Sequence, residues 1–146
     1  MKFIGFEREE EAEVWARDKV GAKYAPSLFR AMSAVDANNE FSCVVVFTNF
    51  TPRNIDLNVA AVGKNWASPK ELVKMFNQIF TYAFHELRAN RTTALIKASN
   101  EPTRAFVEHL GFKLEGTMRD AFEDDDLCIY GFLASEYRTH KWYRGH

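Results

Sequence analysis

The sequence has few of the residues that mark several specialised protein classes. It contains 2 cysteines, 4 prolines and 7 glycines in 146 residues. Cys43 and Cys128 are far apart, neither belongs to a CxxC pair, and both lie in apolar runs. This pattern excludes a disulfide-rich scaffold and favours reduced thiols buried in a core.

The sequence also has no excess of positive or of negative charge. There are 19 basic and 20 acidic residues, and the formal net charge is -1. No surplus of positive charge is therefore available to neutralise phosphates, and we expect no nucleic-acid partner.

Long apolar runs are lacking as well, and we expect no leader sequence. The first residues, "MKFIGFEREEEAEVW", become acidic before an apolar signal core forms. No apolar run approaches the ~20 residues that a membrane-spanning helix needs. We therefore expect a cytoplasmic protein with no membrane partner. Since no repeat, low-complexity tract or linker interrupts the chain, we expect one domain over residues 1–146.

What the sequence does contain is typical of a folded domain with an aromatic core. Hydrophobic residues make up 47% of the chain, and 13 of the residues are phenylalanine. A chain of this length buries a substantial single core, in which the packing of aromatic rings is expected to dominate.

Periodicity and composition predict an alternation of strands and helices. Expected strands are Lys2–Phe6, Phe41–Phe50, Ile55–Val62, Thr92–Ala98 and a hairpin formed by "FKLEGTMRDAF" and "DLCIYGFL". Expected helices are Glu7–Val20, Ala25–Ala34, Pro69–Arg88 and Ala105–Leu110, with one more helical turn in the tail. This order predicts an α/β fold: a mixed central sheet with a parallel centre, antiparallel flanks and helices on both faces.

The helix from Pro69 has the clearest signals. Ser68 and Glu71 form a capping box, and proline occupies the first helical position. One apolar stripe follows the helix, and the polar residues, among them Lys74 and Asn77, are expected on its outer face.

Ligands in such a sheet favour the carboxyl ends of parallel strands and the helix N-termini that follow them. Two connections fit this description, "VGKNWASPK" and "SNEPT". In the first, Lys64, Lys70 and the free amides of the helix would suit a phosphate. The alternative is that Ser68 and Glu71 satisfy those amides themselves and the lysines are only solvated.

Asp56 and Asn58 share one face of their strand. A partly buried carboxylate at Asp56 would serve as a general base, and the alternative is a hydrogen-bonded, solvated strand face. His85 and His109 have no partners at metal-ligand spacing, so we expect no metal.

From Ile55 to Tyr137 the chain resembles the GNAT N-acetyltransferases, particularly the branch of ribosomal-protein N-terminal acetyltransferases. The matching motifs are a helix ending in "AFHEL", an arginine, a strand, "NEPT", a short helix, "LGF" and "EGTMR". In this chain they are Ala83–Phe84, Leu87, Arg91, Asn100 with Thr103, Leu110–Phe112, Glu115–Gly116 and Arg119. The tryptophan before the long helix is similar to GNAT proteins of bacteriophages, which would place the protein in the host cytoplasm.

The resemblance implies a fold in which two central strands splay apart around acetyl-CoA. It further implies direct transfer of acetyl to a primary amine of a protein or a small molecule, by a monomer or homodimer. A backbone amide near Val59 to Ala61 would polarise the thioester carbonyl. Asp56 is the expected base, and Thr103 would position the thiolate or water. The expected cofactor contacts are Ala60, Val62, Lys64, Ser68, Lys70, Asn100, Thr103 and Phe106.

The chain departs from the family pattern at two places. The usual Gly-rich pyrophosphate loop is replaced by "ASPKEL", in which Pro69 offers no amide. Val107 stands where many members have a tyrosine that protonates the thiolate. The alternative to an enzyme is therefore a catalytically inactive GNAT-fold protein with a binding or structural role.

Overall fold

The computed structural model describes residues 1–20, 29–62 and 67–145. The elements, in chain order, are β1 (Lys2–Gly5), α1 (Glu9–Val20), β2 (Arg30–Val35), β3 (Phe41–Thr48), β4 (Asn54–Ala61), α2 (Pro69–Phe80), the π-helix η1 (Thr81–Glu86), β5 (Arg91–Lys97), α3 (Glu101–Leu110), β6 (Lys113–Phe122), β7 (Asp125–Leu133) and α4 (Ala134–Arg138).

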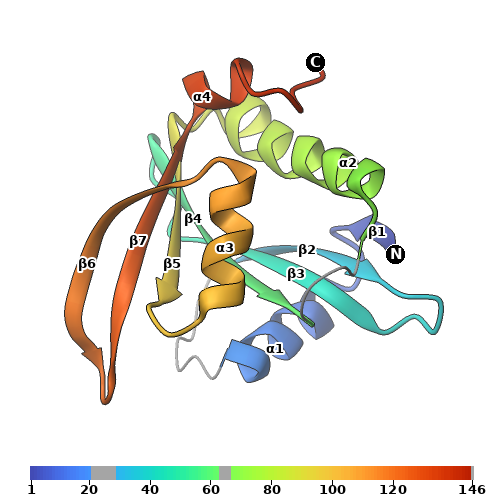
Figure 1. Cartoon of the computed structure of the whole chain (residues 1–146). Helices are drawn as coiled ribbons and strands as arrows, with labels where there is room; N and C mark the ends of the chain where they lie inside the picture. The colour runs from blue at the N-terminus through green and yellow to red at the C-terminus, as the bar shows by residue number, and fades with distance from the viewer. Residues whose placement is uncertain (21–28, 63–66, 146) are drawn as a thin grey trace.

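The strands form one sheet in the order β1-β2-β3-β4-β5-β7-β6 (Figure 1). Only β4 and β5 run parallel, and every other neighbouring pair is antiparallel. The crossover between the two parallel strands is α2 with η1, because parallel neighbours cannot be joined by a tight turn. The predicted mixed α/β sheet, with a parallel centre and antiparallel flanks, is confirmed.

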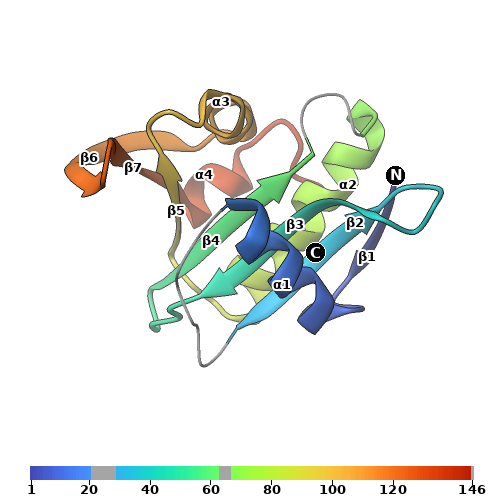
Figure 2. The ribbon, with the colours of Figure 1, turned by 90° about the horizontal axis from the view of Figure 1, so that it is seen from below.

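Helices cover both faces of the sheet (Figure 2). On one face α1 packs against β2, β3 and β4, where Ala12 and Ala16 meet a core that includes Val44, Val46 and Ala60. The other face carries α2 and α3, and its larger core is rich in aromatic rings, such as Phe76, Phe80 and Phe132. The rings of Phe80 and Phe132 lie edge to face, with centroids 4.9 Å apart.

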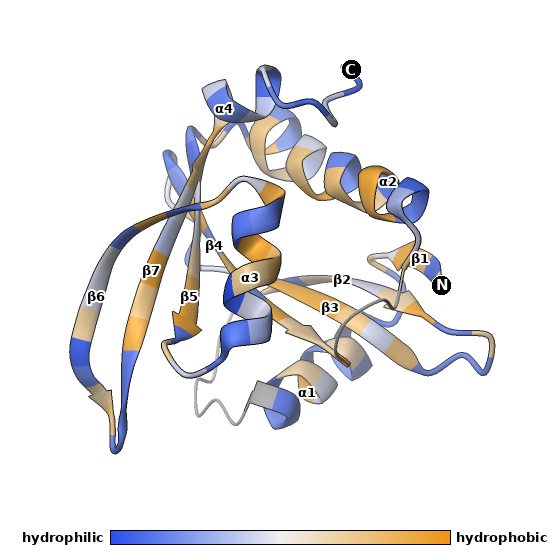
Figure 3. Ribbon diagram, viewed as in Figure 1, coloured by the Kyte–Doolittle hydropathy of each residue, from blue (hydrophilic) through white to orange (hydrophobic). Residues whose placement is uncertain are grey.

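Hydropathy follows this layering, with apolar residues on the central strands and on the inner face of α2 (Figure 3). Cys43 and Cys128 are free and buried, as predicted. Burial raises the pKa of the Cys43 thiol to about 12. No helix among the described residues is long and apolar enough to cross a membrane.

Helix α2 begins as its sequence predicts. The Ser68 hydroxyl accepts a hydrogen bond from the Glu71 amide at 3.2 Å, and the Glu71 carboxylate accepts one from the Ser68 amide at 3.0 Å. At Thr81 the α-helix gives way to a π-helix, in which a backbone amide bonds to the carbonyl of the fifth preceding residue. The Leu87 amide, for example, donates to the Tyr82 carbonyl at 2.9 Å. The expected helix to about Arg88 is thus an α-helix to Phe80, followed by a π-helix to Glu86.

The expected second helix, Ala25–Ala34, is wrong over its last residues. Arg30–Val35 is strand β2, and residues 25–28 lie outside the described part of the chain. Five consecutive residues of β2 are buried, because α1 covers one face and α2 the other. A strand buried on both faces loses the alternation of apolar and polar residues that distinguishes a strand from a short helix.

Candidate functional site: the gap between β4 and β5

The two parallel strands separate halfway along their length. Residues Asn54–Leu57 of β4 pair with Arg91–Ala94 of β5, and the pairing ends there. Strand β4 nevertheless continues to Ala61, where it is still paired with β3. Strand β5 continues to Lys97, where it is still paired with β7. The described sheet therefore has a gap at its centre, bounded by Asn58–Ala61 on one side and residues 95–97 on the other.

Alternation along β4 determines which backbone groups face this gap. The Val62 amide donates to the Ser42 carbonyl at 3.0 Å, so the even-numbered residues of this stretch direct their amides and carbonyls toward β3. The amides and carbonyls of Val59 and Ala61 consequently point into the gap, where β5 no longer pairs with them. On the opposite side, the Ala98 amide bonds to β7, which leaves Leu95 facing the gap.

Ala60 and Val62, two of the predicted cofactor contacts, lie beside these positions. Ala60 is buried under α1 and directs its amide toward β3, whereas Val62 is half-exposed beyond the end of the strand. The neighbouring Val59 and Ala61 direct their backbone groups into the gap, and their partly buried side chains point to the face of the sheet that carries α2 and α3. Strand alternation could have identified this pair from the sequence, had the register of β4 been known.

Helix α3 begins beside the end of β5. The side-chain oxygen of Asn100 accepts a hydrogen bond from the Thr103 amide at 3.3 Å, and Asn100 thereby caps the helix. Thr103 is half-buried on the first turn of α3. Phe106 is half-buried on the next turn and packs against the main core. The predicted residues Asn100, Thr103 and Phe106 therefore all belong to α3 or its N-cap, beside the gap.

The outer side of α3 is fixed by Tyr130 of β7, whose side chain is fully buried. Its phenol donates to the Glu108 carboxylate at 2.5 Å and accepts from the Arg104 guanidinium at 3.0 Å. Arg104 also donates to the Ala98 carbonyl at 3.1 Å, which links α3 back to the end of β5. Burial, followed by the bond to Glu108, raises the pKa of Tyr130, so the phenol stays neutral. This network holds α3 at a fixed position beside the gap.

The N-terminus of α2 offers few free amides. The Ser68 and Glu71 amides are used in the capping box, and Pro69 has none. The Lys70 amide is the donor of the first turn that the box does not use. Lys70 itself is exposed, and predicted Lys64 lies outside the described residues.

Asp56 lies on the face of the sheet that carries α1, one residue before the pairing with β5 ends. Its carboxylate accepts hydrogen bonds from the side-chain amides of Asn49 at 3.0 Å and Asn54 at 2.9 Å. The Asn54 oxygen in turn accepts a bond from the Thr93 hydroxyl at 2.6 Å, across the two strands. Sequence reasoning missed both asparagines. Asn54 could have been found, because it shares the strand face of Asp56, whereas Asn49 is brought there by the turn after β3.

The charged network extends from this point toward the edge of the sheet. Arg91 donates to the Asn54 oxygen at 3.3 Å and forms an ion pair of 2.7 Å with Glu115 of β6. Polar groups of the three strands β4, β5 and β6 are thus connected on one face of the sheet, next to the gap. Among residues 1–20, 29–62 and 67–145, no group of three His, Cys, Asp or Glu side chains is placed to hold a metal.

Known structures share the fold of this chain. The spermidine N-acetyltransferase of Vibrio cholerae, solved in complex with CoA and spermine, superimposes with a TM-score of 0.67 at 14% identity, covering 94% of this chain and 97% of that chain. A dodecameric structure of the spermidine N-acetyltransferase from Vibrio cholerae gives a TM-score of 0.62 at 16% identity, covering 90% and 78% of the two chains. The chain has the GNAT fold.

A relative by sequence supports the same assignment. A protein of Bacillus subtilis (strain 168), named a ribosomal N-acetyltransferase, YdaF, is 37% identical over 68 residues. This match covers 44% of the chain and 37% of the length of that relative. No family profile matches the chain. The gap between β4 and β5 is the feature that the GNAT resemblance implied, and its presence is confirmed.

Proposed function

We propose that the protein is an N-acetyltransferase that transfers an acetyl group from acetyl-CoA to a primary amine. The observation that carries this proposal is the gap between β4 and β5, with the amides of Val59 and Ala61 directed into it. An extended thioester fits such a gap, because its amides can bond to the backbone of β4 as a missing strand would. The relatives described above, which are named acetyltransferases, support the same chemistry.

The cofactor would lie on the side of the sheet that carries α2 and α3. Its pantetheine arm would follow Val59 and Ala61, with Asn100, Thr103 and Phe106 opposite. The pyrophosphate would meet the first turn of α2, where the Lys70 amide and ammonium and the helix dipole favour negative charge. Lys64 and Ser68 complete the proposed set of contacts, together with Ala60 and Val62 as neighbours of the pairing residues.

The amine would approach from the face that carries Asp56. Val59 lies three positions after Asp56, which is about 10 Å of strand, so the carboxylate would remove the proton through intervening water. The freed amine attacks the thioester carbonyl carbon. The carbonyl becomes an oxyanion that a gap-facing amide of β4 stabilises, and the C–S bond then breaks to release CoA thiolate. Thr103 would position the thiolate or the water.

The acceptor is proposed as a class, an amine of a protein or of a small molecule. The two kinds of relative are named for different acceptors, the ribosome and spermidine. An acceptor panel should therefore contain a peptide with a free N-terminus, a lysine peptide with a blocked N-terminus, and spermidine.

A second candidate function has one observation in its favour. The capping box of Ser68 and Glu71 uses the amides that a pyrophosphate loop would offer. An inactive GNAT-fold protein with a binding or structural role would show this feature. Binding and transfer therefore need to be measured separately.

Thermal unfolding with increasing acetyl-CoA tests the binding step. A ligand at 100 times its Kd stabilises the folded state by ~2.7 kcal/mol, and adenosine at the same concentration is the control. Release of free CoA thiol with the acceptor panel tests transfer. A shift with transfer supports the enzyme, a shift without transfer supports the inactive protein, and no shift at millimolar acetyl-CoA overturns the cofactor assignment.

A pair of charge reversals on α2 locates the phosphates. Lys70→Glu is expected to weaken acetyl-CoA binding, whereas Lys74→Glu, one turn further along the same face, is expected to leave it unchanged. Equal effects of the two variants would remove Lys70 from the proposed site.

A further inference from the structure

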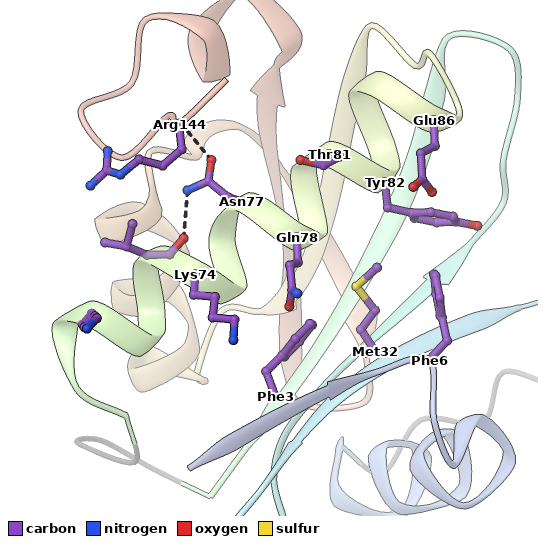
Figure 4. A pocket seen from close by; sticks show the side chains of 13 residues that line it. Phe3, Phe6, Met32, Lys74, Asn77, Gln78, Thr81, Tyr82, Glu86 and Arg144 are labelled. Atoms are coloured by element: carbon purple, nitrogen blue, oxygen red, sulfur yellow. Dashed lines mark hydrogen bonds between the residues drawn. The ribbon is translucent and has the colours of Figure 1, made fainter. Parts of the chain in front are cut away.

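A cavity lies away from the gap, between α2 and the edge strand β1 (Figure 4). Its volume is about 570 Å³, which lies in the range of small-molecule sites. Strands β2 and β3 separate β1 from β4, so this groove and the gap are different sites on the same molecule.

Apolar side chains line the middle of the groove. Phe3 of β1 and Met32 of β2 face the polar side of α2 across the cavity (Figure 4). Phe6 and Tyr82 continue the lining toward η1, with ring centroids 4.9 Å apart. Phe3 is half-buried, so part of its ring surface is open to a ligand, whereas Met32 is 5% exposed and forms the floor of the cavity.

Positive charge gathers at one end. Lys70 and Lys74 lie one turn apart on α2, and both line the cavity and are exposed. Within the described part of the chain neither lysine forms an ion pair. Figure 4 shows Lys74 directed toward Phe3. The first turn of the helix adds its dipole at the same end.

The other two charged residues that line the cavity, Glu86 and Arg144, do not neutralise the positive charge of the lysines. Glu86 lies at the far end, 12 residues beyond Lys74 along the helix, or about 18 Å. Arg144 donates to the carbonyls of Lys141 and Tyr143, and its guanidinium points away from the cavity (Figure 4). The groove therefore combines an apolar middle with one cationic end.

We propose that this groove binds an amphipathic carboxylate. The apolar body of the ligand would pack on Phe3, with Met32 beneath it, and its carboxylate would lie against the ammonium group of Lys74, since Lys70 is a proposed phosphate contact. Burial of apolar area supplies affinity, and Lys74 supplies selectivity for an anion over a neutral or cationic ligand of the same shape.

Calorimetric titration with decanoate, kept below its micelle concentration, tests the proposal. We expect saturable binding of one decanoate per chain, and weaker binding of decyltrimethylammonium by at least tenfold. Equal affinities for the anion and the cation, or the absence of saturable binding, would overturn the proposal.

Two charge reversals locate the site. Lys74→Glu should weaken decanoate binding by at least tenfold. Lys2→Glu is the matched control, because Lys2 is exposed on β1 next to Phe3 but does not line the cavity. It should change the affinity by less than twofold, and an equal loss in both variants would overturn the assignment. Thermal unfolding of each variant without ligand verifies that it folds.

The two proposals can fail separately. Lys74 is not among the cofactor contacts, so Lys74→Glu should keep the shift that acetyl-CoA produces. Binding of decanoate in a protein that shows no response to acetyl-CoA would support the groove and overturn the cofactor site.

Discussion

The phenol of Tyr137 donates a hydrogen bond of 2.9 Å to the side-chain oxygen of Asn77, and this contact ties α4 to α2. The same oxygen accepts a bond of 3.1 Å from the Arg144 amide. The Asn77 amide group donates to the Trp142 carbonyl at 2.7 Å and to the Val73 carbonyl at 2.9 Å. Asn77 was expected on the solvated face of its helix, and it instead anchors the C-terminal segment.

Replacing Asn77 should therefore destabilise the fold. Asn77→Ala leaves the Tyr137 hydroxyl and three backbone groups without this partner, and we expect the free energy of unfolding to fall by about 1–3 kcal/mol. Denaturant unfolding measures the change. Asn90→Ala is the control, because Asn90 is exposed, and it should stay within ~0.5 kcal/mol of the unchanged protein. Equal losses in the two variants would contradict the role of Asn77.

A glycine at the end of α3 gives a second prediction. Gly111 has φ of +112°, and a Cβ atom there would lie 3.1 Å from Phe132 and 3.3 Å from His140. Gly111→Ala should cost about 1–3 kcal/mol, since it combines backbone strain with crowding. Gly116→Ala is the matched control, because nothing lies within 4 Å of its Cβ position. A Gly111→Ala protein as stable as the control would show that the helix ends differently.

The role of Asp56 can be tested separately from binding. Asp56→Asn keeps the shape of the side chain but removes the base, so kcat should fall by roughly 10²–10⁴-fold while the thermal shift with acetyl-CoA persists. Asp124→Asn, at an exposed position in the turn between β6 and β7, is the comparison and should retain activity. Full activity of Asp56→Asn would remove Asp56 as the base.

The loop after β5 carries a pH-dependent contact. The Ser99 hydroxyl donates to the Asp125 carboxylate at 2.5 Å, and this bond is the main reason why the pKa of Asp125 lies below its usual range. A lowered pKa stabilises the folded state above the pKa of the unfolded chain, and this contribution is lost as the pH falls through the folded pKa.

Ser99→Ala should raise the pKa of Asp125 toward its ordinary value. The variant should be less stable than the unchanged protein at neutral pH, and the difference should shrink in acid. Carboxyl carbon chemical shifts across a pH titration measure the pKa directly. Glu11, whose pKa is lowered by its hydrogen bond to Arg8 elsewhere in the molecule, should titrate identically in both proteins. An unchanged Asp125 titration would contradict the assigned cause.

Local chemistry determines where the helices begin and end. The Ser68 capping box, the Asn100 cap and the left-handed Gly111 each depend on residues within a few positions of one another. Such signals act through bonds inside one turn, so they can be recognised in the sequence. The β6–β7 hairpin can also be recognised in the sequence, because a short polar turn joins two β-rich runs.

The sequence by itself therefore determined the order of most elements, the helix caps and the resemblance that pointed to the GNAT fold. Only the tertiary structure decided that Arg30–Val35 is a strand, because layers from both sides bury it. Only the tertiary structure, too, revealed where β4 and β5 part, which backbone amides face the gap, and that Asn49 reaches Asp56. These features depend on contacts between segments distant in the chain, and no local pattern encodes the register that brings such segments together.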